Sequence, residues 1–201
     1  NYRRAQPKID GDVHDWSDEF LLPRLGEIDG RRDFAEVWSC WNEQGLCVAC
    51  RVVDKRRPLR CDPRSFWTGD NLRLCIDMRD ARTVKRATRF CQQIYFLPTG
   101  GGSNAAAPAA GVNKFQRARE DAPQIPAERI TIAAKVNASG YSLEAHIPAD
   151  CLIGFDPIEH PRIGFYYILE DGDHVQQYLT VGDDLYWYVD PSTWATAVLQ
   201  K

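Results

Sequence analysis

The sequence predicts an all-β protein, an antiparallel β-sandwich with only minor short helices. Segments in which apolar and polar residues alternate recur at short intervals, and this is the period of a strand with one buried face. Turn-forming residues separate these segments, and no long amphipathic helix interrupts them. With 201 residues, the chain is expected to fold as one domain, 1–201, that buries a full core.

The first strand pair is expected to be a hairpin. Phe34–Trp41 alternates, Asn42–Gly45 supplies a short loop, and Leu46–Val53 returns as the partner strand. The alternation puts Trp38 and Trp41 on opposite faces of the first strand. We expect one of these two rings to be packed inside the sandwich.

Seven cysteines contain no pattern of paired spacings that would indicate a zinc site. If Trp41 opposes Leu46 in the hairpin, Cys40 opposes Cys47 on the same face. A disulfide between these two residues and a pair of buried free thiols both fit this register.

The chain is organised around the stretch Phe66–Asp80. Leu72, Leu74 and Ile76 alternate with polar residues and predict a strand with one buried face, and Gly69 turns the chain just before it. Trp67 therefore lies on the entering loop. A large aromatic residue there serves either as a plug of the core or as a platform on which a planar ligand stacks, and the plug is the commoner use.

The remaining elements follow from the same pattern. A mobile loop is expected at about 99–112, where the sequence is of low complexity, a single helical turn at Pro148–Leu152, and a turn at Asp29-Gly30. Further strands are expected at Phe90–Leu97, Arg129–Val136, Tyr141–Ile147, Gly164–Glu170, His174–Val181 and Trp194–Leu199.

The charge distribution bears on possible partners. A formal net charge of −3 argues against a general nucleic-acid binder, and no apolar run is long enough for insertion into a membrane. Between Arg51 and Arg89, however, 12 Lys and Arg residues face 5 Asp and Glu. The basic band formed by Lys55–Arg57 and Lys85-Arg86 fits either a docking site for an acidic partner or two solvated loops.

No catalytic constellation stands out, so the domain is not expected to be an enzyme by itself. The four histidines are scattered, and no nucleophile motif is present. The acidic groups Glu170–Asp173 and Asp183-Asp184 fall where turns are expected, and there they serve mainly in backbone hydrogen bonding. No cofactor is certain: a structural calcium ion is possible, although no twelve-residue calcium loop supports it, and the metal ligands stay unknown.

Aromatic residues gather where strands end. Tyr186, Trp187 and Tyr188 lie together in one loop close to Trp194, and Trp67 lies at another strand end. Aromatic faces stack on the apolar faces of sugar rings, while neighbouring polar groups bind the hydroxyls. The same pattern is also expected if these rings pack over the ends of the sandwich, so sugar binding and packing both remain as interpretations.

Six motifs in order resemble family 9 carbohydrate-binding modules. They are I-D-G followed by D-W, V-W-S-C-W-N-E-Q-G-L-C-V-A-C-R-V-V-D, W-T-G-D-N-L-R-L-C-I-D, Y-S-L-E-A-H-I-P, I-G-F-Y-Y-I-L-E-D and D-P-S-T-W-A-T-A-V-L, and they cover Ile9 to Leu199. The resemblance implies an immunoglobulin-like, DOMON-like sandwich that binds carbohydrate. It further implies other domains of a larger secreted protein, often a glycoside hydrolase, an extracellular or periplasmic location, a role in carbohydrate catabolism, and structural calcium in some members.

The resemblance also suggests site residues. In the sugar-binding members two Trp clamp a terminal sugar, and Trp67 matches the first. At the position of a sugar-binding Glu on a strand of the family, this chain has Arg73. The position of the family's Arg on the next strand falls near Gln92. Trp187 could replace the second Trp, but only through a different loop path. Because Arg pairs bidentately with carboxylates, Arg73 in place of Glu suggests an acidic sugar such as a uronate.

Two other classes of function are kept open. Related sandwiches hold a b-type haem through Met with His or Lys for electron transfer, and Met78 is the only Met in the chain. The third class is a structural or protein-interaction sandwich without a sugar site, in which the basic band contacts an acidic partner.

Overall fold

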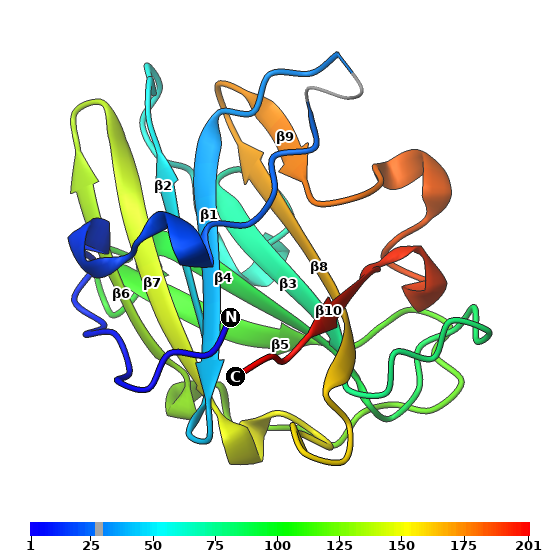
Figure 1. Ribbon diagram of the computed structural model, residues 1–201. Helices are drawn as coiled ribbons and strands as arrows, with labels where there is room; N and C mark the ends of the chain where they lie inside the picture. The colour runs from blue at the N-terminus through cyan, green and yellow to red at the C-terminus, as the bar shows by residue number, and fades with distance from the viewer. Residues whose placement is uncertain (27–29) are drawn as a thin grey trace.

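The computed structural model describes residues 1–26 and 30–201 and confirms an antiparallel β-sandwich. Two sheets face each other, with the N-terminal segment running across the outside of one of them (Figure 1). The helices of the described residues are single 3-10 turns, and none is long and apolar enough to cross a membrane. Asp29, in the expected turn at Asp29-Gly30, lies outside the described residues.

The strands divide into a four-stranded and a six-stranded sheet. The first has the order β1-β2-β7-β6, with β1 Ala35–Asn42, β2 Gly45–Val52, β7 Gly140–Pro148 and β6 Thr131–Asn137. The second has the order β10-β8-β3-β4-β5, with β10 Ala195–Val198, β8 Arg162–Asp171, β3 Asn71–Asp77, β4 Cys91–Gly101 and β5 Ala107–Asn113, and β9 Val175–Tyr178 also pairs with β8. The 3-10 turns are η1 Val13–Asp15, η2 Asp18–Phe20, η4 Pro63–Ser65, η5 Ala127–Arg129, η6 Ala149–Cys151, η7 Asp183–Leu185 and η8 Pro191–Thr193.

The first hairpin has the predicted register. Trp41 pairs with Leu46, and Cys40 pairs with Cys47. Both cysteines are buried, and the structure leaves them as free thiols. Of the two alternatives that the sequence left open, the structure therefore has the pair of buried thiols.

Both tryptophans of β1 are buried, but in different places. Trp41 belongs to the main core between the sheets, together with Val37 on the same face. Trp38 lies on the other face, where Trp16 and Phe20 of the N-terminal segment cover it in a second, smaller core. The expectation that one of these rings packs inside the sandwich is confirmed for Trp41.

The expectation that β3 buries only one face is wrong. Leu72, Leu74 and Ile76 point into the core, yet the other face of the strand, with Arg73 and Cys75, is buried as well. We call this side of the six-stranded sheet its outer face. Loops that fold back over it bring aromatic rings against it, so the polar residues of β3 are covered by protein.

The segment 99–112, expected to be a mobile loop, forms most of the hairpin of β4 and β5. Gly111 of this segment is explained by packing. At Gly111 a Cβ atom would lie 2.1 Å from the ring of Tyr95 on the neighbouring strand. The small residues of β5 therefore make room for the large ring that lies across from them.

Candidate functional site

Trp67 lies on an ordered loop with its side chain in solvent. The loop begins with η4, where the carboxylate of Asp62 accepts hydrogen bonds from the Arg64 N–H at 2.9 Å and the Ser65 hydroxyl at 3.0 Å. It ends at Gly69, whose φ of +81° and close approach to the carbonyl oxygen of Arg60 exclude a side chain. Trp67 is 52% exposed. It is therefore not the plug of the core that the sequence favoured.

A stack of rings supports the Trp67 indole from below. Phe66 is buried and lies parallel to Tyr95 of β4, with ring centroids 4.2 Å apart and planes 7° apart. Trp67 stands on Phe66 edge to face, with centroids 5.2 Å apart and planes 88° apart. The loop is thus anchored to the outer face of the sheet, and one large ring is held above it.

Arg73 lies next to this stack, because it pairs with Tyr95 across β3 and β4. Its guanidinium donates to the carboxylate of Glu170 on β8 and, through Nε, to the side-chain oxygen of Asn71 at 3.1 Å. The Arg73 side chain is only 8% exposed. Burial raises the pKa of Glu170, and the charge of Arg73 opposes that rise. The carboxylate partner that was expected from an acidic sugar is already supplied by the protein.

Trp187 does contact Arg73, but as a buried ring. The guanidinium carbon of Arg73 lies 5.1 Å from the centroid of the Trp187 ring. The Trp187 ring also stacks on Tyr166 of β8, with ring centroids 4.9 Å apart, and its indole N–H donates to Asp183 at 2.8 Å. With 1% exposure, Trp187 closes the outer face of the sheet and offers no surface for stacking. Its neighbour Tyr186 is 62% exposed.

Gln92 does not share a surface with Arg73, and this part of the expected site is wrong. It pairs with Ile76, so its side chain points to the inner side of the sheet, opposite to that of Arg73. There its amide donates to the Cys151 carbonyl at 2.9 Å and accepts from the Ile153 N–H at 2.7 Å. Gln92 therefore fixes the segment after β7 in place.

The residue that does share the outer face with Arg73 is Gln93. It pairs with Cys75 and accepts a hydrogen bond from Asn113 of β5 at 2.6 Å. The register between β3 and β4 identifies it, since Arg73 opposes Tyr95, and the period of the strand puts Gln93 on the same side as Tyr95. Sequence reasoning missed this residue because it placed the matching position by motif and not by register.

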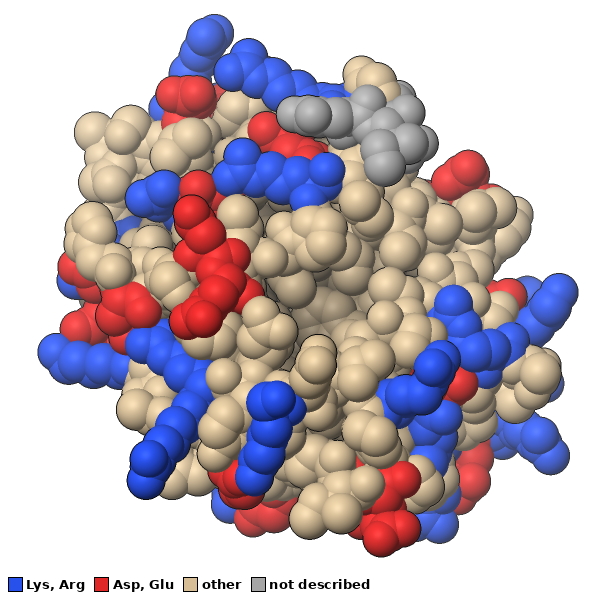
Figure 2. Space-filling view, in the orientation of Figure 1, with Lys and Arg blue, Asp and Glu red and all other residues tan. Residues whose placement is uncertain are grey.

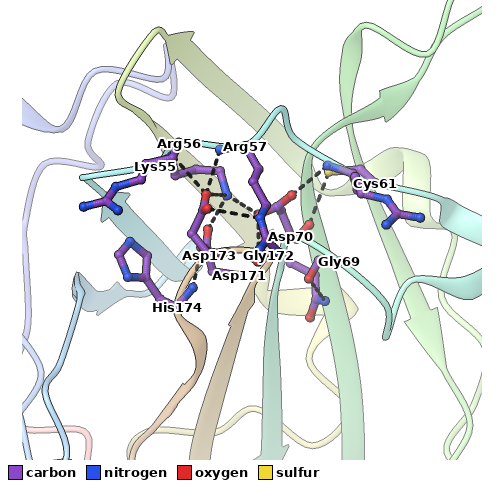
Figure 3. A network of polar contacts seen from close by, with 12 residues as sticks. Lys55, Arg56, Arg57, Cys61, Gly69, Asp70, Asp171, Gly172, Asp173 and His174 are labelled. Carbon is purple, nitrogen blue, oxygen red and sulfur yellow. Dashed lines mark hydrogen bonds and ion pairs between the residues drawn. The ribbon is translucent and has the colours of Figure 1, made fainter.

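Two of the acidic turn residues, Asp171 and Asp173, lie with Asp70 around the buried side chain of Lys55. The Lys55 ammonium lies 2.6 Å from Asp70, 2.7 Å from Asp171 and 3.5 Å from Asp173, and its side chain is 4% exposed (Figure 3). Among the described residues, no group of three or more His, Cys, Asp or Glu is arranged to hold a metal ion. Lys55 therefore cannot belong to the exposed basic band that the sequence suggested, because its side chain is buried.

Met78 follows β3 and is buried in the core with 2% exposure. Met78 lines neither the wide groove beside His174 nor the small hollow beside Gln92. The position of Met78 therefore gives no support to the haem alternative.

A wide groove, of about 1620 Å³, opens between the loops around β1, β2 and β9. Figure 2 shows charged side chains of both signs at the top of the view, where these loops lie. Seven cationic and six acidic side chains line the groove, so its charge is nearly balanced. Phe34 and His174 stack inside it with centroids 4.8 Å apart. Trp67, Arg73, Gln92 and Trp187 take no part in its lining.

Comparisons with known proteins agree with this architecture. No protein-family model matches the sequence, and no curated protein matches it. Two solved structures of a family 9 carbohydrate-binding module from Caldicellulosiruptor kristjanssonii do match. The complex with cellotriose has a TM-score of 0.65 at 15% identity and covers 96% of this chain and 89% of that one. The complex with glucose has a TM-score of 0.68 at 16% identity and covers 99% and 94%. The chain therefore has the fold of family 9 carbohydrate-binding modules.

Proposed function

We propose that this protein is a non-catalytic carbohydrate-binding module and that sugar binds against Trp67. The observation that carries the proposal is the Trp67 indole, which is half exposed yet held on a rigid loop by the stack of Phe66 on Tyr95. An exposed ring that is already ordered can stack on a sugar at little cost in conformational entropy. The solved modules of the same fold, which were determined with cellotriose and glucose, support carbohydrate as the ligand class.

The surroundings of Trp67 favour a neutral sugar at this position. Arg73 was the reason to expect a uronate, but its guanidinium is buried and bonded to Glu170. A carboxylate ligand would have to displace Glu170 and leave that buried group without its partner, which is costly. We therefore propose stacking of an uncharged sugar on Trp67, with polar contacts from the rim of the loop.

The wider setting is proposed from the fold. We infer that the module acts outside the cytoplasm as one part of a larger secreted protein that degrades carbohydrate. Six of the seven thiols are buried, and Cys61 alone is partly exposed. Such burial limits the access of oxidants, so free thiols in this fold are compatible with an oxidising compartment.

A glycan array followed by calorimetry tests the proposal. The array should contain glucose, cello-oligosaccharides and uronate oligosaccharides, and we expect a hit among the neutral sugars. Trp67→Ala should weaken that binding about tenfold or more, because losing a stacked ring costs roughly 1–3 kcal/mol. The matched control is Leu185→Ala, which removes another exposed apolar side chain. An array without hits, or a hit that Trp67→Ala leaves unchanged, would show the proposal to be wrong.

A further inference from the structure

A surface of strong positive charge lies at the end of the six-stranded sheet where β3 stops. We define this basic surface by nine cationic side chains from the loop after β3, the loop after β5 and the start of β8, with only three acidic ones among them. The cations are Arg79, Arg82, Lys85, Arg86, Arg89, Lys114, Arg117, Arg119 and Arg162, and the acids are Asp80, Glu120 and Asp121. In Figure 2, Lys and Arg side chains gather at the right of the view, over these loops.

The two loops form one connected surface. Arg86 of the first loop donates to the carbonyl oxygens of Arg117 at 2.6 Å and Ala118 at 3.1 Å in the second. The backbone N–H of Arg119 in turn donates to the Ala87 carbonyl at 2.8 Å. These bonds hold cations from distant parts of the sequence side by side, which repulsion between like charges would otherwise oppose.

The acidic residues do not neutralise this surface. Arg82 and Arg162 share the single carboxylate of Asp80, at 3.7 and 3.4 Å. The pairs of Arg89 with Glu120 at 3.7 Å and of Lys114 with Asp121 at 2.9 Å use the other two acids. Lys85, Arg117 and Arg119 remain exposed and form no ion pair with any described residue. The protein carries a net charge of −3, so this concentration of cations is local.

The shape and chemistry of the basic surface restrict its partner. The hollow between its loops has a volume of about 10 Å³, room for a single water molecule, so a small ligand has no pocket here. No exposed aromatic ring of the described residues belongs to it, since Phe90 is half-buried under the guanidinium groups of Arg79 and Arg89, at 4.2 and 5.9 Å from its centroid. An exposed apolar side chain beside it is Val198, which pairs with Arg162. Without an exposed ring the surface cannot stack the bases of single-stranded nucleic acid, and one valine is little to insert into a membrane. Exposed guanidinium groups fit carboxylates or sulfates displayed along a chain.

We propose that the basic surface binds a polyanionic polysaccharide, one with carboxylate or sulfate groups along its length. The choice of a polysaccharide over another polyanion rests on the proposed carbohydrate-binding function. Trp67 precedes β3 and the basic surface follows it, so the two sites lie at opposite ends of a seven-residue strand, about 20 Å apart. The neutral sugar beside Trp67 and the acidic chain on the basic surface are therefore separable ligands.

Affinity electrophoresis in gels that contain polygalacturonate, dextran sulfate or neutral dextran tests this proposal. We expect retardation by the two acidic polymers at low salt and little by neutral dextran. The retardation should weaken steeply as salt is added, because exposed charges are screened. Poly-glutamate and duplex DNA serve as competitors of other classes. No retardation by either acidic polysaccharide, or competition by poly-glutamate or DNA at equal or lower charge concentration, would overturn the proposal.

Variants locate the binding. The triple substitution Lys85→Gln, Arg117→Gln and Arg119→Gln should weaken binding to the acidic polymers at least tenfold. The matched control is Arg4→Gln, Arg32→Gln and Arg56→Gln, which removes the same charge from exposed positions elsewhere and should retain most of the binding. Melting curves check that both proteins are folded. Equal losses in the two triple variants would overturn the proposal. Trp67→Ala should leave binding to the acidic polymers intact. The test of the basic surface can therefore fail or succeed independently of the test of the neutral-sugar site.

Discussion

The indole N–H of Trp16 donates a 2.7 Å hydrogen bond to the carboxylate of Glu144, which is fully buried on β7. The other carboxylate oxygen accepts from the backbone N–H groups of Gly11 at 2.7 Å and Asp10 at 3.1 Å. One buried acid therefore holds both parts of the N-terminal I-D-G and D-W pattern against the four-stranded sheet. This attachment places Trp16 over Trp38 and completes the second core.

Glu144→Ala should destabilise the fold by about 3 kcal/mol or more, because it leaves three donors without an acceptor and each buried unpaired donor costs about 1–3 kcal/mol. Urea denaturation followed by tryptophan fluorescence measures the change. Glu128→Ala, at an exposed position, is the control and should change stability little. A loss as small as that of the control would mean that the N-terminal segment is held by its apolar contacts alone.

Lys55→Met should lower the free energy of unfolding by about 3 kcal/mol, since it leaves the carboxylates of Asp70 and Asp171 close together without a cation. The same carboxylates accept backbone N–H groups from the loops around them, so these loops should loosen as well. Denaturation curves together with hydrogen exchange at 54–60 and 171–174 report both effects. Lys85→Met, at an exposed lysine, is the control, and a Lys55 variant as stable as this control would contradict the prediction.

The hairpin of β1 and β2 shows what the sequence pattern can predict well. The turn residues between the strands determine the register of the hairpin. In this register Cys40 pairs with Cys47. Local rules suffice here because every pairing partner lies within a few residues. The existence and order of most other strands follow from the same local alternation.

The site required information that local patterns lack. Gln92 and Gln93 are adjacent, and a shift of one residue decides which side chain joins Arg73 on the outer face. Trp187 is buried because Tyr166, more than twenty residues before it in the chain, lies beneath its loop. Whether Arg73 is free depends on Glu170 of β8. Each of these is a contact between distant segments, which neither alternation nor turn residues reveal.

His146 should make the fold less stable as the pH falls below neutrality. Burial lowers the pKa of this histidine, with partial opposition from a hydrogen bond to the backbone at Gln44, and its Nε2 has no partner among the described residues. The folded state therefore binds the proton less readily than the unfolded state, whose histidine pKa is about 6.5. The free energy of unfolding is therefore unaffected by His146 well above that pH. It falls as the pH drops below that value, until the lower pKa of the folded state is reached.

Comparison of two variants isolates this effect from that of the carboxylates. His146→Gln should show a shallower fall of the unfolding free energy between about pH 7 and 5 than the wild type. His160→Gln, at an exposed position, should keep the slope of the wild type. Urea denaturation at several pH values measures both. If the slope of His146→Gln equals that of the wild type, protonation of His146 does not contribute.

Trp67 and Trp187 should respond to truncation in opposite ways, because one ring is half exposed and the other is fully packed. Trp187→Ala removes the stack on Tyr166, the hydrogen bond to Asp183 and the contact with Arg73, and it should cost about 3–5 kcal/mol, as expected for a buried tryptophan. Trp67→Ala loses only the edge contact with Phe66 and should cost less than about 1 kcal/mol. Denaturation curves of both variants, with Tyr186→Ala as an exposed control from the same loop as Trp187, measure the difference. If Trp67→Ala proved as damaging as Trp187→Ala, Trp67 would be a structural ring after all, and its loss of sugar binding could then be explained by unfolding alone.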